Sequence, residues 1–176
     1  MTAQHSLADF YAGSGRDDRG RLLHQIQTWS DGELERVHNY MQWLFPLTER
    51  SAFNPRGPIL DAKTIGEFRK RPSLRAHLEI SFVRMLAFFG FELVKENPLR
   101  VVPSKWFAEQ AENWLRPSNH NYHRITRMIK SLRLLGLDEQ ALAFFRCLAQ
   151  LYDKESETAE PRISPQTYAF WKAAAA

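Results

Sequence analysis

The sequence predicts a mainly α-helical fold, namely a compact multi-helix single domain with one short β-hairpin near residues 92–102. Its length of 176 residues lies in the range of one domain, and apolar side chains recur every three or four residues through most of the chain. Strand-like spacing occurs in FELVKENPLRVVP, where two apolar runs flank a turn at residues 95–98. We expect a helical domain over residues 6–155, followed at 156–176 by an acidic linker and a short C-terminal helix.

The first half of the chain contains helical repeats separated by turns. Ser30 and Glu33 form a capping box. The helix that starts there is expected to continue to Pro46, since the residue before a proline avoids the helical region. Its expected buried side is Leu34, Val37, Met41, Leu44 and Phe45. The preceding GSGRDDRGR segment predicts a flexible turn rather than a phosphate loop, because its glycine spacing is wrong and no strand precedes it.

A long loop is expected over residues 46–60. It either packs against the core as a structural element or forms the edge of a binding site. Ordered loops of this length are usually functional or packed down by their own side chains. Phe53 and Ile59 are expected to supply that packing. The polar residues Asn54 and Arg56 lie between them and are candidates for ligand contact.

Helix signals continue after this loop. Asp61 is expected to cap a short helix, Pro72 to begin a longer one, and Gly90 to end it. Asp138 opens a further helix, and Ser164 precedes a short terminal one. The expected buried side of the helix after Asp138 is Leu142, Phe145, Leu148, Ala149 and Tyr152.

The segment SNHNYHRITRMIKSLRLLG predicts a helix with one apolar and one basic side. From residue 116 to residue 137 it carries five Lys or Arg and no Asp or Glu. Its apolar side is Ile125, Met128, Ile129, Leu132 and Leu135, and its basic side is His123, Arg127, Lys130 and Arg133, with Arg124 at the boundary. Three interpretations stay open: a solvated face, a surface for an anion or acidic partner, or a nucleic-acid surface.

Several classes of site find little support. Cys147 is the sole cysteine, so no internal disulfide forms, and its helix-core neighbours indicate a buried, inert thiol. His120 and His123 share a helix face, but with His38 they lack a complete ligand set, so we expect neither a metal nor a cofactor. No catalytic motif is present, and we expect a non-enzyme.

The chain is expected to be soluble, intracellular and cytoplasmic. Its beginning lacks the features of a signal peptide, and its apolar runs fall short of the roughly 20 residues that a spanning helix needs. The net charge of +4 is compatible with an acidic protein or with nucleic acid.

The candidate ligand-binding residues combine polar groups beside the loop with the start and basic side of the 118–136 helix. They could converge in one polar pocket, because long loops often fold back onto helix ends. The set is His38, Gln42, Trp43, Asn54, Arg56, Asn119, His120, His123, Arg124, Arg127 and Lys130.

The chain resembles the conserved N-terminal region of the opioid growth factor receptor family. The resemblance rests on FYAGSGRDDRGR, LERVHNYMQWLFPLTERSAFNP, FVRMLAFFGFEL and NWLRPSNHNYHRITRMIKSLRLLGLDEQALAFF, between about Phe10 and about Asp153. It implies a compact, mostly helical domain without known catalytic residues. It also implies a relation to vertebrate proteins described as receptors for an enkephalin-type peptide, which are nuclear or perinuclear and carry long tails.

These observations together predict a binding module for a peptide or an acidic protein partner. The first alternative is a nucleic-acid-binding helical protein that uses the basic helix at 116–133. The second is an enzyme with a histidine-containing polar pocket. The oligomeric state stays open.

Overall fold

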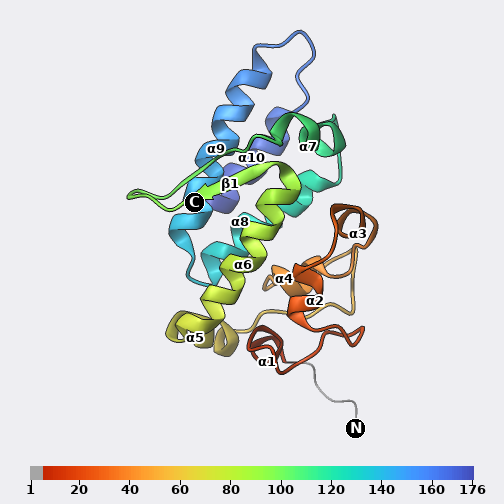
Figure 1. The fold of residues 1–176 in the computed structure, drawn as a ribbon, viewed down its shortest axis with the longest axis vertical. Coiled ribbons are helices and arrows are strands. Elements are labelled where there is room, and N and C mark those ends of the chain that lie inside the picture. The colour runs from red at the N-terminus through yellow and green to blue at the C-terminus, as the bar shows by residue number, and fades with distance from the viewer. Residues whose placement is uncertain (1–5) are drawn as a thin grey trace. The chain divides into compact units, whose positions relative to one another are not determined.

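The computed structural model describes residues 6–176 and is mainly α-helical, with one two-stranded antiparallel sheet among the described residues (Figure 1). The predicted fold class and the predicted hairpin are both confirmed. The elements are α1 (Leu7–Tyr11), α2 (Leu23–Gln27), α3 (Asp31–Arg36), α4 (Met41–Leu44), α5 (Ala62–Lys70), α6 (Pro72–Phe89), β1 (Phe91–Val94), β2 (Arg100–Pro103), α7 (Phe107–Trp114), α8 (Asn121–Leu134), α9 (Asp138–Ser156) and α10 (Pro165–Ala175).

The chain divides into two compact units. The first contains the residues up to Arg84 together with Leu134–Gly136, and the second contains Met85–Arg133 and Leu137–Ala176. The long helix α6 therefore begins in the first unit and ends in the second. The expected boundary between residues 155 and 156 stays a prediction.

The core of the first unit is built from aromatic side chains of short elements. Phe10 of α1 packs against Trp43 of α4 with ring centroids 5.2 Å apart, and Tyr11 packs against Phe68 of α5 at 5.1 Å. The Tyr11 hydroxyl donates a hydrogen bond to the carbonyl of Leu44. Burial holds the pKa of Tyr11 well above its ordinary value. Tyr11 therefore stays neutral and links the end of α4 to α1.

The helix predicted from Ser30 to Pro46 is wrong in one respect, because the structure has two short helices there. The backbone of Val37 is extended, with ψ 134°, which ends α3 before α4 begins. Tyr40 lies in the break, and its hydroxyl donates to the carbonyl of Leu34 at 3.0 Å. The break leaves Asn39 outside both helices. Its side-chain oxygen there accepts a hydrogen bond from Arg21, and its backbone carbonyl accepts one from Asn54.

The predicted caps in the first unit are confirmed. Ser30 and Glu33 form the capping box of α3, and the carboxylate of Asp61 accepts from the backbone of Thr64 at the start of α5. Pro72 begins α6. The side chain of Arg75 donates to the carbonyls of Phe68 and Arg69, which satisfies the end of α5.

The second unit places the hairpin and α10 on α9. Strand β1 pairs with β2 in the register Phe91 with Pro103 and Val94 with Arg100. Strand β2 contacts α9, and α10 runs beside α9 (Figure 1). Trp114 of α7 is fully buried, and its indole donates to the carbonyl of Phe89 at 3.0 Å. This bond fixes the end of α6 against α7.

Helical spacing predicted the buried side of α8 better than that of α9. All five residues predicted for the apolar side of this helix are buried, and the last of them, Leu135, directly follows the end of α8. Along α9, Leu148 is buried as expected, but Leu142 is 38% exposed, while Phe144 and Cys147 take core positions. Tyr152 stacks on Tyr168 of α10 with ring centroids 4.2 Å apart, so part of the expected core side contacts α10 instead.

The connection from α9 to α10 is held by a buried carboxylate. Glu155 is only 5% exposed, and its oxygens accept from Arg162 at 2.5 and 2.8 Å. The hydrogen bonds from Arg162 hold the pKa of Glu155 below its ordinary value. The carbonyl of Arg162 accepts from the Tyr122 hydroxyl at 2.9 Å, which ties this connection to α8.

Replacing Gly90 by alanine should destabilise the protein strongly. Gly90 has φ +84°, and an added Cβ would lie 2.7 Å from the Cα of Phe107. We expect a loss of about 2–4 kcal/mol in the free energy of unfolding. Gly66→Ala is the matched control, since nothing lies within 4 Å of its Cβ position in α5, and it should stabilise by about 0.5–1 kcal/mol. Urea unfolding measures both, and equal effects would refute the close approach at Gly90.

The ion pair of Glu155 should make part of the stability pH-dependent. A carboxyl with a lowered pKa in the folded state contributes its full stabilisation above the unfolded pKa of about 4.3. That contribution disappears as the pH falls through the lower pKa of the folded state. Thermal unfolding of the wild type and of Glu155→Gln should therefore differ most above about pH 5 and converge in acid. A difference that stays constant with pH would contradict this role.

Candidate functional site

The GSGRDDRGR segment is organised around the fully buried carboxylate of Asp17. Its Oδ1 accepts from the backbone amides of Arg19 and Arg21 at 2.9 and 2.8 Å, and its Oδ2 accepts from Nε of Arg21 at 2.6 Å. The backbone amide of Asp17 donates in turn to the carbonyl of Arg21 at 2.9 Å. The segment predicted to be a flexible turn is therefore a hydrogen-bonded loop.

A chain of polar contacts leads from this carboxylate to the long loop. Nη2 of Arg21 donates to Oδ1 of Asn39 at 2.9 Å. The side-chain amide of Asn54 donates to the carbonyl of Asn39 at 3.4 Å and lies 3.5 Å from Oε1 of Gln42. These contacts connect Asp17, at one end, with the middle of the loop at the other.

Residues 47–60 form a loop, called the 47–60 loop below. One hydrogen bond joins its two ends and another lies within it. The amide of Leu60 donates to the carbonyl of Leu47 at 2.9 Å, and Nη1 of Arg50 donates to the carbonyl of Pro55 at 2.5 Å. Gly57 passes close to α4, since a Cβ there would lie 3.0 Å from the Cβ of Gln42. The loop is therefore held by polar groups of its own base and of α4.

The prediction that Phe53 and Ile59 pack the loop down is wrong. Phe53 is 83% exposed and Ile59 is 42% exposed. The amide of Phe53 donates to the hydroxyl of Ser51 at 3.2 Å, which fixes the turn that carries the ring outward. The polar contacts described above, together with the buried side chain of Leu60 at the base, anchor the loop. Phe53 is thus an exposed aromatic side chain on an anchored loop.

Five of the predicted site residues lie in the first unit, and they take different roles. Gln42 is buried and contacts Asn54, as the sequence suggested for polar groups of the helix end and the loop. Trp43 is also buried, and its indole donates to the carboxylate of Asp18 at 2.9 Å, so it anchors the core. His38 and Arg56 are exposed.

The other predicted residues lie in the second unit, at the start of α8 and along it. Oδ1 of Asn119 accepts from the amide of Asn121 at 2.9 Å, at the start of this helix. The side chains of His120 and His123 are exposed. Arg124, expected at the boundary of the basic side, is only 6% exposed, and Arg127 and Lys130 are half-buried. The hypothesis of one shared polar pocket stays a prediction.

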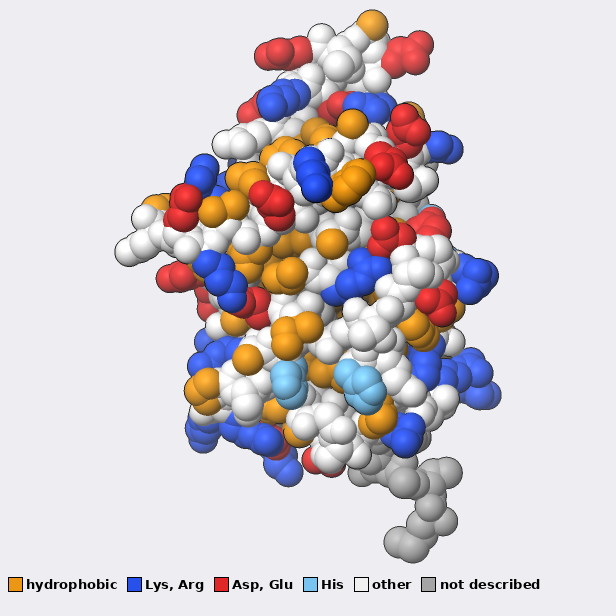
Figure 2. All heavy atoms as spheres, in the orientation of Figure 1, with side chains coloured by type: hydrophobic (Ala, Val, Ile, Leu, Met, Phe, Trp, Pro, Cys, Tyr) orange, Lys and Arg blue, Asp and Glu red, His pale blue; other side chains and the backbone are white. Residues whose placement is uncertain are grey.

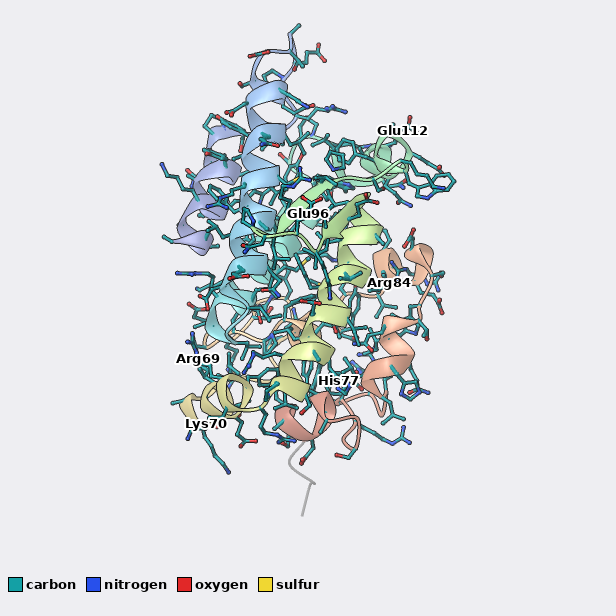
Figure 3. All side chains as sticks on the ribbon, turned by 60° about the vertical axis from the view of Figure 1, so that its left-hand side comes forward. Arg69, Lys70, His77, Arg84, Glu96 and Glu112 are labelled. Carbon is teal, nitrogen blue, oxygen red and sulfur yellow. The ribbon has the colours of Figure 1, made fainter. Side chains whose placement is uncertain are left out.

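Sequence reasoning overlooked a basic surface at the end of α5. Arg69, Lys70 and Arg71 are consecutive and exposed, and Lys and Arg side chains gather over α5 in Figure 2. Figure 3 shows Arg69 and Lys70 on this helix. Nε of Arg69 donates to the carbonyl of Leu134 at 3.2 Å, which caps the end of α8 within the first unit. The run RKR was the available signal in the sequence.

Two kinds of feature are absent from residues 6–176. Within this range no group of three or more His, Cys, Asp or Glu side chains is arranged to hold a metal ion. None of the helices in the same range is both long and apolar enough to cross a membrane.

Comparison with known proteins identifies the family. The family model described as the opioid growth factor receptor (OGFr) conserved region matches residues 14–160. This chain belongs to the opioid growth factor receptor family. The matched range contains Asp17 and its hydrogen-bond partners, the 47–60 loop and α8.

Curated relatives within this family extend well beyond the shared region. The opioid growth factor receptor of Rattus norvegicus is 37% identical over 122 residues, which cover 68% of this chain and 21% of the rat protein. Opioid growth factor receptor-like protein 1 of Xenopus tropicalis is 36% identical over 125 residues, covering 70% and 23%. The Homo sapiens receptor is 33% identical over 115 residues, covering 64% and 17%. This chain thus spans about a fifth of the length of these relatives, and no solved structure matches it.

Neutralising Asp17 should destabilise the protein far more than the same change at an exposed ion pair. Asp17→Asn removes the charge opposite Arg21, whose side chain is 17% exposed. We expect a loss of about 2–4 kcal/mol in the free energy of unfolding. Asp31→Asn is the matched control, because Asp31 is 42% exposed in its pair with Arg84, and it should cost less than about 1 kcal/mol. Similar midpoints of urea unfolding for both variants would contradict the role of Asp17.

Proposed function

We propose that this chain is a non-catalytic binding module that recognises a peptide or an acidic protein segment through the 47–60 loop. The observation that carries the proposal is the 83% exposure of Phe53 on a loop held by hydrogen bonds. Aromatic side chains contribute disproportionately to binding energy at protein interfaces. A loop that is ordered before binding also loses less conformational entropy on association.

The charge of the loop supports an acidic partner. Among its fourteen positions it carries two arginines, Arg50 and Arg56, and one acidic residue, Glu49. Arg56 is exposed three residues from Phe53, and a guanidinium is suited to paired contacts with a carboxylate. The loop therefore suits a ligand in which an apolar side chain lies next to a carboxylate.

The names of the relatives are consistent with such a role. They include proteins named opioid growth factor receptor, and such a name denotes recognition of a growth factor. We propose that this chain is likewise a recognition module. The peptide that it recognises is to be identified by the display experiment described next. The polar groups at the start of α8, with Arg127 and Lys130, are proposed as a second contact surface.

A peptide-display library panned on the full chain tests the proposal directly. Enriched peptides would be synthesised, and their Kd measured by fluorescence anisotropy for the wild type, Phe53→Ser and Phe170→Ser. Phe170, at 49% exposure on α10, is the matched aromatic control. Phe53→Ser should weaken binding at least about tenfold, as expected for an interface anchor, whereas Phe170→Ser should change it less than about twofold. Equal Kd values for all three proteins would refute the loop as the site.

Nucleic acid binding is the second candidate, favoured by the exposed run Arg69–Lys70–Arg71. The same anisotropy assay with duplex DNA and single-stranded RNA, between about 50 and 200 mM salt, separates the two. Binding to phosphates weakens steeply as salt rises, since each neutralised phosphate releases counterions. The peptide proposal would be replaced if the chain binds DNA or RNA tightly, with a steep dependence on salt. That binding would have to be abolished by Lys70→Glu or by the pair Arg127→Glu and Lys130→Glu.

A further inference from the structure

A cavity of about 220 Å³ lies in the second unit, between β2 with the preceding turn and the middle of α9. Its walls include Leu99, Val101, Ala143, Arg146, Cys147 and Gln150. The hairpin packs against α9 beside it (Figure 1). The proposed function does not involve this cavity, and the inference below does not depend on the 47–60 loop.

The interior of the cavity is apolar. Val101, Ala143 and Cys147 are 6%, 3% and 5% exposed and line it together with Leu99. Burial raises the pKa of the Cys147 thiol to about 12. At neutral pH this thiol is therefore uncharged and forms part of an apolar wall, in agreement with the inert thiol predicted from the sequence.

The rim of the cavity is cationic. Arg146 and Gln150 lie four residues apart on α9, so they share one face of the helix, and both are exposed. Arg100, on β2, is already paired with Glu96 at 2.7 Å. Arg146 forms no ion pair or hydrogen bond with another of the described residues. No acidic side chain is among those that line the cavity.

The volume limits the size of a ligand. An apolar cavity of about 150 Å³ accommodates benzene. The additional room here corresponds to roughly two or three further carbon atoms. A ligand of this size has about eleven non-hydrogen atoms, for which a Kd on the order of 1 mM is realistic.

We propose that this cavity binds a small monocarboxylate whose apolar body is about as large as a phenylethyl group. The body occupies the space between Val101, Ala143 and Cys147. The carboxylate lies at the rim, where the guanidinium of Arg146 and the side-chain amide of Gln150 donate hydrogen bonds to it. The arginine gives selectivity for the anion, and the apolar walls exclude strongly polar ligands.

The test uses 3-phenylpropionate and its neutral counterpart 3-phenylpropanamide, titrated into the isotope-labelled full chain. Binding of the acid should shift the backbone amide resonances of Val101, Ala143 and Cys147 in a saturable manner, with at least about tenfold lower Kd than the amide. Arg146→Gln, a change at an exposed position, should raise the Kd of the acid to that of the amide. Arg116→Gln, at another exposed arginine of the second unit, is the control and should leave the Kd of the acid unchanged.

A second readout uses the sole cysteine. Alkylation of Cys147 by N-ethylmaleimide at pH 9 should be at least about fivefold slower with saturating 3-phenylpropionate, because the ligand covers the thiol. Ala143→Leu, which fills the cavity, should slow alkylation without any ligand and remove the saturable shifts. The proposal would be overturned if no saturable shifts occur up to about 20 mM acid. It would also be overturned if acid and amide have equal Kd values and Arg146→Gln does not alter them.

Discussion

The buried carboxylate of Asp17 is the interaction on which the first unit depends. A carboxylate out of contact with water is tolerated only where donors surround it, and here a guanidinium and two backbone amides do so. Arg21 carries the effect onward to Asn39, and Asn39 supports Asn54 of the loop. Each of these links is polar and directional, so the middle of the loop has a defined position although Phe53 and Ile59 are exposed.

Two places on this protein combine an apolar group with an arginine. On the 47–60 loop the apolar group projects outward as the ring of Phe53, and at the hairpin the apolar surface is concave, with Arg146 at its edge. Our two proposals assign to both places a ligand that carries an apolar group next to a negative charge. The proposed ligand of the loop is a partner with its own pocket, and that of the cavity is a molecule small enough to enter it. The net charge of +4 favours the approach of either.

Local signals in the sequence predicted the helix ends well. Ser30, Asp61 and Gly90 each act within a few residues of their own position, so spacing alone identifies them. The break at Val37 and the exposure of Phe53 depend on contacts between distant segments, and an apolar residue in a loop resembles a core residue in sequence. Gln42 and Asn54 were both named as candidates from the sequence and are in contact. The roles of Asp17 and Asn39 were not predicted, since nothing nearby in sequence marks them.

The return of Leu134–Gly136 to the first unit has a consequence for biosynthesis. Arg69 contacts the carbonyl of Leu134, which is synthesised 65 residues later. A ribosome adds about 5–20 residues per second, so the 50 residues between Arg84 and Leu134 take roughly 3–10 s. During that interval the basic end of α5 lacks its last partner on the nascent chain. Folding of the first unit is therefore completed only after residues 85–133 of the second unit have been made, although most of the first unit's residues precede them.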